Sequence, residues 1–194
     1  IAEHTGLIVP IGEFVIAQSL SFLQKWQVKH QQKYCISVNL SPRQFRDSGL
    51  LNFIKQSLIQ NEINPECLNL EITEGVLLTG QSYIHNTLAE FKNLGVKLAM
   101  DDFGTGYSSL SYLRQYSFVV LKIDRSFVNR ITQNKADKDL VKATIAMSLS
   151  LGLTVIAEGV ETKQQLSLLE ELDCEFVQGF YLSKPVPKKQ LLDL

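Results

Sequence analysis

Polar side chains that suit metal chemistry recur along this 194-residue sequence, each near the end of a short apolar run. In chain order they are Asn39, Glu71, Asp101, Lys122, Glu158 and Gln178. Any one of them alone would usually be a helix cap or a solvated loop residue. A polar group at the end of a buried strand is costly unless it is paired or bound, so six in succession indicate a common site. Carboxylate and amide oxygens are the ligands that Mg²⁺, Mn²⁺ and Ca²⁺ prefer. The expected metal ligands are Asn39, Glu71, Asp101 and Glu158.

Lys122 lies in an otherwise apolar run, two residues before Asp124, with which it would share a strand face. An internal ion pair between these two residues is the structural interpretation. In the functional interpretation, Lys122 places a fixed positive charge beside a reacting water or a phosphate. The other polar residues at strand ends favour this functional interpretation.

The adjacent carboxylates Asp101 and Asp102 extend the metal hypothesis. Consecutive strand residues point to opposite faces, so both can reach one site only where the strand ends or bulges. Gly104 and Gly106 follow directly and favour such a turn, and their segment predicts a mobile lid. One carboxylate shared between two ions, with its neighbour on the second ion, is typical of a two-metal hydrolytic site.

The elements that must position these residues alternate between strands and helices. The expected strands span residues 34–40, 68–74, 97–103, 118–124, 154–160 and 176–182, and amphipathic helical stretches separate them. This alternation predicts an α/β fold of parallel βα units, with active-site residues at the carboxyl ends of the strands. An open doubly wound sheet is the alternative, but the sequence lacks both a G-x-G-x-x-G and a G-x-x-x-x-G-K-[ST] phosphate loop.

The repeat length favours a (β/α)8 barrel, which uses roughly 31 residues per unit. Six strands are visible in the sequence and eight are needed to close such a barrel. We therefore expect two strands to be missing before Ile1. Without them the chain should fold poorly or leave sheet edges open, and should be inactive alone.

Composition and charge exclude several other classes of protein. The net charge of −1, with no basic stripe, argues against a nucleic-acid polymer as partner. No apolar run reaches the length of a membrane span, and no secretion signal precedes the first helix. The histidines lack zinc-ligand spacing. The three cysteines, which are far apart in the sequence, are expected to be small core residues in a reducing compartment; they are Cys35, Cys67 and Cys174.

Several segments together resemble a known family, the EAL domains, which are cyclic di-GMP phosphodiesterases of bacteria. The matching segments are T-G-L-I (5–8), P-I-G-E-F-V (10–15), V-N-L-S (38–41), L-E-I-T-E (70–74), D-D-F-G-T-G-Y-S-S-L (101–110), L-K-I-D (121–124), A-E-G-V-E (157–161) and Q-G-F (178–180) with Pro185. The resemblance implies a modified TIM-type (β/α)8 barrel whose first strand runs antiparallel to the others. It also implies hydrolysis of one phosphodiester bond of cyclic di-GMP to linear pGpG with two Mg²⁺ or Mn²⁺ ions.

The resemblance also implies roles for single residues. The ligands of the first ion would be Asn39, Glu71 and Asp101, and those of the second Asp101, Asp102 and Glu158. Lys122 resembles the residue that holds or activates the attacking water, and Gln178 one that orients a water at the metals. Glu74 resembles the glutamate that anchors the loop after Asp102. The surrounding shell would include Glu161, Asp124, Gly104 and Gly106.

The E-A-L signature itself is absent, because in the family it lies upstream of the T-G-L-I segment. The absence agrees with the deficit of two strands, and residues 1–194 are therefore interpreted as a single EAL-type domain that is incomplete at its N-terminus. Family behaviour further predicts a homodimer, an upstream sensor or GGDEF-type domain, and a cytoplasmic location for this domain, within a protein that can be attached to a membrane.

Two other functions compete with hydrolysis. A catalytically inactive cyclic di-GMP receptor is the first, although such proteins usually lose metal ligands or the D-F-G-x-G loop, and the ligand positions present here are intact. A metal-assisted enolising barrel enzyme is the second, which the Asp101–Asp102 doublet and Asn39 disfavour because they suit two ions better than one.

Overall fold

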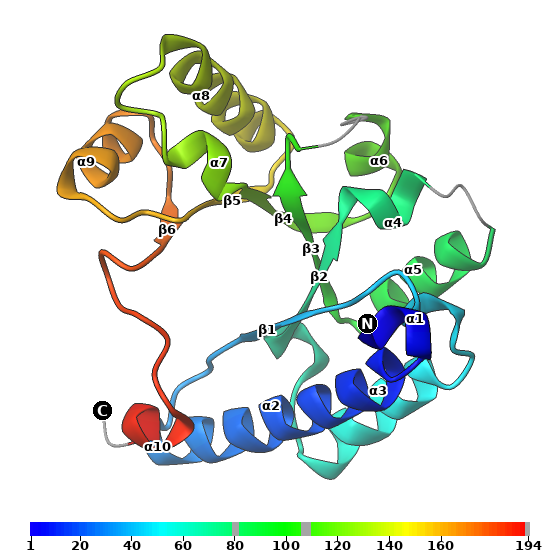
Figure 1. The fold of residues 1–194 in the computed structure, drawn as a ribbon. Coiled ribbons are helices and arrows are strands. Elements are labelled where there is room, and N and C mark those ends of the chain that lie inside the picture. The colour runs from blue at the N-terminus through cyan, green and yellow to red at the C-terminus, as the bar shows by residue number, and fades with distance from the viewer. Residues whose placement is uncertain (79–81, 106–109, 193–194) are drawn as a thin grey trace. The chain divides into compact units, whose positions relative to one another are not determined.

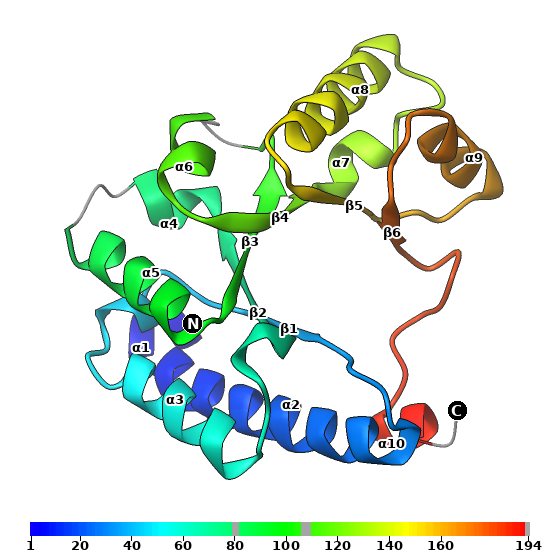
Figure 2. The same ribbon diagram turned by 180° about the vertical axis from the view of Figure 1, so that it is seen from behind.

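The predicted alternation of strands and helices is confirmed in a computed structural model that describes residues 1–78, 82–105 and 110–192 (Figures 1 and 2). The six strands are β1 (Ile36–Asn39), β2 (Leu68–Thr73), β3 (Lys97–Phe103), β4 (Phe118–Ile123), β5 (Thr154–Glu158) and β6 (Phe176–Gln178). They follow one another in chain order in one sheet, and the pairs β1–β2, β4–β5 and β5–β6 are parallel. Parallel neighbours connected through helices are the βα units that the sequence predicts.

Helices of very different lengths connect these strands. They are α1 (Ala2–Thr5), α2 (Ile8–His30), α3 (Leu50–Gln60), α4 (Glu74–Leu78), α5 (Ser82–Leu94), α6 (Leu110–Gln115), α7 (Arg125–Val128), α8 (Lys135–Ser150), α9 (Lys163–Glu171) and α10 (Lys188–Leu192), with short 3₁₀ segments η1 (Gln44–Arg46) and η2 (Pro65–Cys67). Local sequence signals mark several of their ends. The Asn134 side chain accepts hydrogen bonds from the first turn of α8, and α5 ends at Gly95, whose φ of 90° suits a residue without a Cβ.

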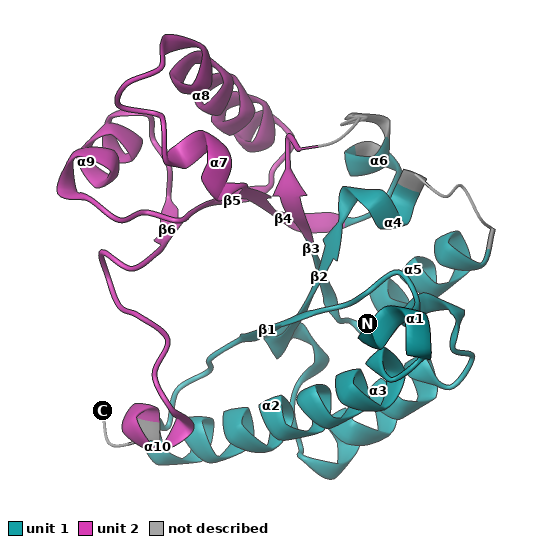
Figure 3. Cartoon of the chain, viewed as in Figure 1, with its two compact units in different colours: residues 1–99, 110–117 teal, residues 100–109, 118–194 magenta. Residues whose placement is uncertain are grey.

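The chain divides into two compact units, coloured separately in Figure 3. Unit 1 comprises Ile1–Ala99 and Leu110–Ser117, and unit 2 comprises Met100–Ser109 and Phe118–Leu194. Strand β3 contributes its first residues to unit 1 and its last residues to unit 2.

The core of unit 1 forms where α2 packs against α3 and β1, and where α3 packs against α5. Ile16 and Leu20 of α2 are fully buried there, as are Ile54 of α3 and Phe91 of α5. Burial of such large apolar side chains stabilises the unit by roughly 1.5–3 kcal/mol each.

The core of unit 2 forms where α8 packs against β4 and β5 and where α7 packs against β5. Leu121 of β4, Val155 of β5 and Ile145 of α8 are buried at this contact. Since both faces of a parallel strand are usually covered, β4 is apolar along most of its length, and the charged Lys122 within it stands out.

The last strand is shorter than the sequence predicts. β6 ends at Gln178 instead of continuing to residue 182. A Cβ on Gly179 would lie 2.1 Å from the carbonyl oxygen of Val160, so only glycine permits this close approach. The Tyr181 amide then donates to the same Val160 oxygen at 2.9 Å, and the backbone turns away from an extended path.

Among the described residues, no helix combines the length and the apolar character needed to cross a membrane.

Candidate metal centre

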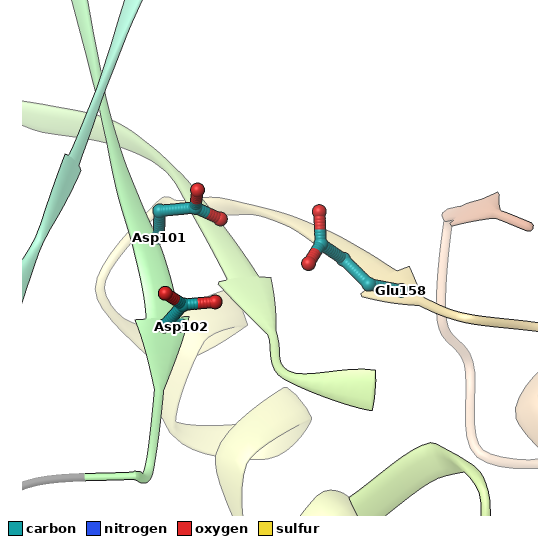
Figure 4. Close-up of side chains that lie close together, drawn as sticks. All are labelled: Asp101, Asp102 and Glu158. Atoms are coloured by element: carbon teal, nitrogen blue, oxygen red, sulfur yellow. The ribbon is translucent and has the colours of Figure 1, made fainter. Parts of the chain in front are cut away.

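Three carboxylates meet where β3 and β5 end. Asp101 and Asp102 belong to β3, and Glu158 is the last residue of β5. One oxygen from each lies within 4.8 Å of the others, and Figure 4 shows the three carboxylates turned toward a common space. Hard oxygen donors this close together suit a divalent cation such as Mg²⁺, Mn²⁺ or Ca²⁺.

Backbone geometry explains how two consecutive residues face one site. Asp102 has a φ of 54°, in the left-handed region, which reverses the alternation of side chains that an extended strand would impose. Its carbonyl oxygen accepts hydrogen bonds from the Thr105 amide at 3.3 Å and from the Thr105 hydroxyl at 2.9 Å. Gly104 completes the turn with a φ of 97°, and a Cβ there would lie 2.9 Å from the Phe127 ring. The turn expected after the doublet is therefore present as far as residue 105, whereas Gly106 lies outside the described residues.

Lys122 carries positive charge into this acidic cluster. Its side chain extends from β4, and only 4% of the residue is exposed. Its Nζ lies 3.0 Å from Asp101 Oδ1 and 2.6 Å from Glu158 Oε1. Ion pairs at these distances in a buried setting are strong, so the ammonium group holds both carboxylates in fixed positions.

Asp102 titrates abnormally in this setting. Burial raises the pKa of its carboxyl above the usual value, and the negative charges of Asp101 and Asp124 raise it further. Lys122 lowers the pKa but does not cancel these effects. A site that concentrates like charges in this way would bind a divalent cation favourably, because the cation neutralises the repulsion. The residues present therefore fit a metal ion.

Asp124 and Glu74 begin helices rather than ending strands as the sequence predicts. The Asp124 side chain accepts a hydrogen bond from the Ser126 amide at 2.9 Å and caps α7. Glu74 is the first residue of α4 and is buried. A carboxylate at a helix N-terminus is stabilised by the unpaired amides there, which explains both positions.

Asn39 and Glu71 lie side by side on neighbouring strands. They are register partners at the carboxyl ends of β1 and β2, with Glu71 buried and Asn39 exposed. Both belong to unit 1, whereas Asp101, Asp102 and Glu158 belong to unit 2. Asn39 and Glu71, the two predicted metal ligands in unit 1, are therefore neighbours in the structure.

A cavity of about 210 Å³ opens beside Glu158. Its lining includes the predicted residues Glu161 and Gln178, and also Arg125 and Phe180. Gln178 is the register partner of Glu158, which places it next to the carboxylate cluster. The sequence analysis assigns no role to Arg125 or Phe180. Phe180 lies in the Q-G-F segment that resembles the family, whereas an arginine after a strand has no spacing that distinguishes it from a surface residue.

Gln165 is a further residue on which the site depends and to which the sequence analysis assigns no role. It is 6% exposed, and its Oε1 accepts hydrogen bonds from the Glu161 amide at 2.8 Å and the Thr162 amide at 2.9 Å. Its Nε2 donates to the Val128 carbonyl oxygen at 3.3 Å, which connects α9 to α7. The T-x-x-Q spacing of a capping box was the available signal. These bonds fix the segment that follows Glu158.

Replacing Gln165 with leucine should destabilise the protein by about 3 kcal/mol, because two amides and one carbonyl lose their buried partner. Urea unfolding of the variant measures this difference. Gln164→Leu is the matched control, since Gln164 is exposed on the same helix and should change the free energy of unfolding by less than about 0.5 kcal/mol. Equal stability of the two variants would show that the hydrogen bonds of the Gln165 side chain do not stabilise the fold.

Comparisons with known proteins agree with this geometry. The EAL domain family matches residues 1–185. The bifunctional diguanylate cyclase/cyclic di-GMP phosphodiesterase MucR of Pseudomonas aeruginosa is 39% identical over 192 residues, covering 99% of this chain and 28% of MucR. The signaling protein YkoW of Bacillus subtilis is also 39% identical over 192 residues, covering 98% of this chain and 24% of YkoW. The chain thus spans about a quarter of the length of these relatives.

Solved structures share the fold. The phosphodiesterase structure of MucR in complex with cyclic di-GMP superposes with a TM-score of 0.93 at 39% identity, covering 98% of this chain and 77% of that one. A calcium and cyclic di-GMP complex of Klebsiella pneumoniae BlrP1 gives a TM-score of 0.80 at 27% identity, covering 88% of this chain and 43% of that one. The expected modified TIM-type fold is therefore confirmed.

Proposed function

This chain belongs to the EAL domain family, and from that membership we propose that it forms the catalytic part of a cyclic di-GMP phosphodiesterase. The reaction adds water to one phosphodiester phosphorus and breaks its bond to a ribose 3′-oxygen, which leaves linear pGpG. The observation that carries the proposal is the buried Lys122 ammonium between Asp101 and Glu158, beside the third carboxylate Asp102. Residues 1–194 are taken as one EAL-type domain.

Two divalent ions, Mg²⁺ or Mn²⁺, are the proposed cofactors. Asp101, Asp102 and Glu158 would hold one of them, and the resemblance predicts Asn39 and Glu71 as ligands of the other together with Asp101. When bound, such ions lower the pKa of a water molecule and neutralise charge on the phosphate. The calcium complex of BlrP1 supports a preference for hard divalent cations.

Side chains of this chain would orient the nucleotide and provide a fixed positive charge beside the reacting groups. Lys122 is held by two carboxylates, so its positive charge stands in a fixed position from which it can stabilise an attacking water or a phosphate oxygen without reorganisation. Gln178 and Arg125, which line the cavity beside Glu158, offer an amide and a guanidinium for the rest of the nucleotide. From the resemblance, the proposed role of Glu74 is to anchor the loop after Asp102, and that of Glu161 is to support the same shell of residues.

The direct test uses the natural full-length protein, because this chain spans about a quarter of its curated relatives. Incubation with cyclic di-GMP and Mn²⁺ or Mg²⁺ should yield pGpG, measured by liquid chromatography, and a chelator should stop its formation. Tight nucleotide binding without pGpG in the presence of either metal would overturn hydrolysis and indicate a receptor. Homodimerisation, an upstream sensor or GGDEF-type domain and a cytoplasmic location stay predictions of the resemblance.

A further inference from the structure

The amino ends of β1 and β2 bring two cysteines together. Ile36 and Leu68 are the first register partners of these parallel strands, and Cys35 and Cys67 are the residues directly before them. Neighbouring strands lie about 4.7–4.9 Å apart. Cys35 and Cys67 each lie one residue outside the paired strands, Cys67 as the last residue of η2, and a separation close to that spacing falls within the Cα separation of about 4.4–6.8 Å that a disulfide requires.

The Cys35 side chain reaches the backbone beside Cys67. Cys35 Sγ lies 3.7 Å from the carbonyl oxygen of Glu66, the residue bonded to Cys67, and Cys67 is near enough to affect the titration of the Cys35 thiol. Both thiols are free. Cys35 is exposed, whereas Cys67 is only 1% exposed. The prediction that the three cysteines are core residues is therefore confirmed for Cys67 and wrong for Cys35, which precedes β1 on the surface, and Cys174 is half-buried.

We propose that Cys35 and Cys67 form a reversible disulfide, with a peroxide as the oxidant. The exposed Cys35 thiolate attacks one peroxide oxygen, the O–O bond breaks, and Cys35 becomes a sulfenic acid as the first water leaves. The Cys67 thiolate then attacks the Cys35 sulfur, the S–O bond breaks, and the second water leaves as the S–S bond forms. The two cysteines lose two electrons and two protons, and one hydrogen peroxide is reduced to two waters.

The surroundings of Cys35 set the rate of this step. Burial and the neighbouring Cys67 raise the pKa of the Cys35 thiol, while Lys97 and Lys33 lower it by a smaller effect. Glu66, which faces the same site, is paired with Lys33 at 3.0 Å. Because the thiolate is the nucleophile, the oxidation rate should rise about tenfold per pH unit until the pH reaches the pKa.

The test is peptide mapping of the natural full-length protein after treatment with hydrogen peroxide and alkylation of the remaining thiols. Trypsin places Cys35 in peptide 34–43, Cys67 in peptide 56–92 and Cys174 in a third peptide. The expected result is a linked pair of the first two peptides, lighter by two hydrogen atoms than their sum, which dithiothreitol separates. The number of thiols titrated in the unfolded protein should fall by two.

Control variants decide between this bond and other oxidation products. Cys174→Ser should still lose two thiols, whereas Cys35→Ser should lose none, and Cys35 is exposed enough for this variant to fold. Peptides 34–43 carrying a sulfinic or sulfonic acid, or a covalent dimer on a non-reducing gel, would overturn the proposal. The measurement needs no nucleotide, so its outcome is independent of the proposed phosphodiesterase activity.

Discussion

Replacing Asp101 with asparagine is expected to reduce the turnover of cyclic di-GMP by roughly 10³-fold, at the upper end of the loss for one preorganised electrostatic contact. The substitution preserves the shape of the side chain but removes its negative charge. A carboxylate oxygen of Asp101 lies within 4.8 Å of oxygens of Asp102 and Glu158, and Asp101 forms an ion pair with the Lys122 ammonium at 3.0 Å. The loss therefore affects both the proposed metal site and the position of the lysine. Steady-state formation of pGpG measures the effect.

Asp139→Asn is the matched control, because Asp139 is exposed on α8 and the same change of charge there should leave turnover unaltered. Thermal unfolding of both variants separates lost chemistry from lost structure. Asp101→Asn should retain part of its affinity for the nucleotide, since the cavity residues Arg125 and Gln178 are unchanged. A near-normal kcat in this variant would contradict the proposed role of the carboxylate cluster.

The sequence predicts the strands well where apolar runs are bounded by strong local signals. β3 spans residues 97–103 as expected, since Gly95 ends the preceding helix and Gly104 follows the strand. The strand ends at Glu74 and Asp124 are predicted less well. In both places a carboxylate favours the start of a helix over one more strand residue, and this competition depends on amides that only the folded backbone positions.

The contacts of the site depend on register, which the sequence does not reveal. Lys122 meets Asp101 and Glu158 from other strands, although Asp124 is its nearest acidic residue in the sequence. The register of β1 and β2 likewise places Cys35 beside Cys67, although the two residues are far apart in the sequence. A shift of one residue in the pairing of a strand turns every side chain to the other face, so residue spacing alone cannot specify such partners.

Replacing Lys122 with methionine is expected to lower kcat by roughly 10²–10³-fold, within the range for a positioned proton-transfer or charged group. Methionine preserves most of the buried length of the lysine stem but leaves Asp101 and Glu158 without their shared ammonium. If Lys122 acts on the transition state, kcat should fall while KM changes little. Initial rates over a range of cyclic di-GMP concentrations separate these two constants.

The same substitution also tests whether Lys122 serves mainly the fold. Breaking a buried ion pair by removing one partner costs about 3–5 kcal/mol, so a structural role alone would lower the folded fraction and leave kcat per folded molecule unchanged. Circular dichroism gives the folded fraction at the assay temperature. Lys142→Met is the control, since Lys142 is exposed on α8. A loss of rate that disappears after correction for the folded fraction would exclude a catalytic role. A loss that persists would show that Lys122 contributes to turnover itself, through its own charge or through the positions in which it holds Asp101 and Glu158.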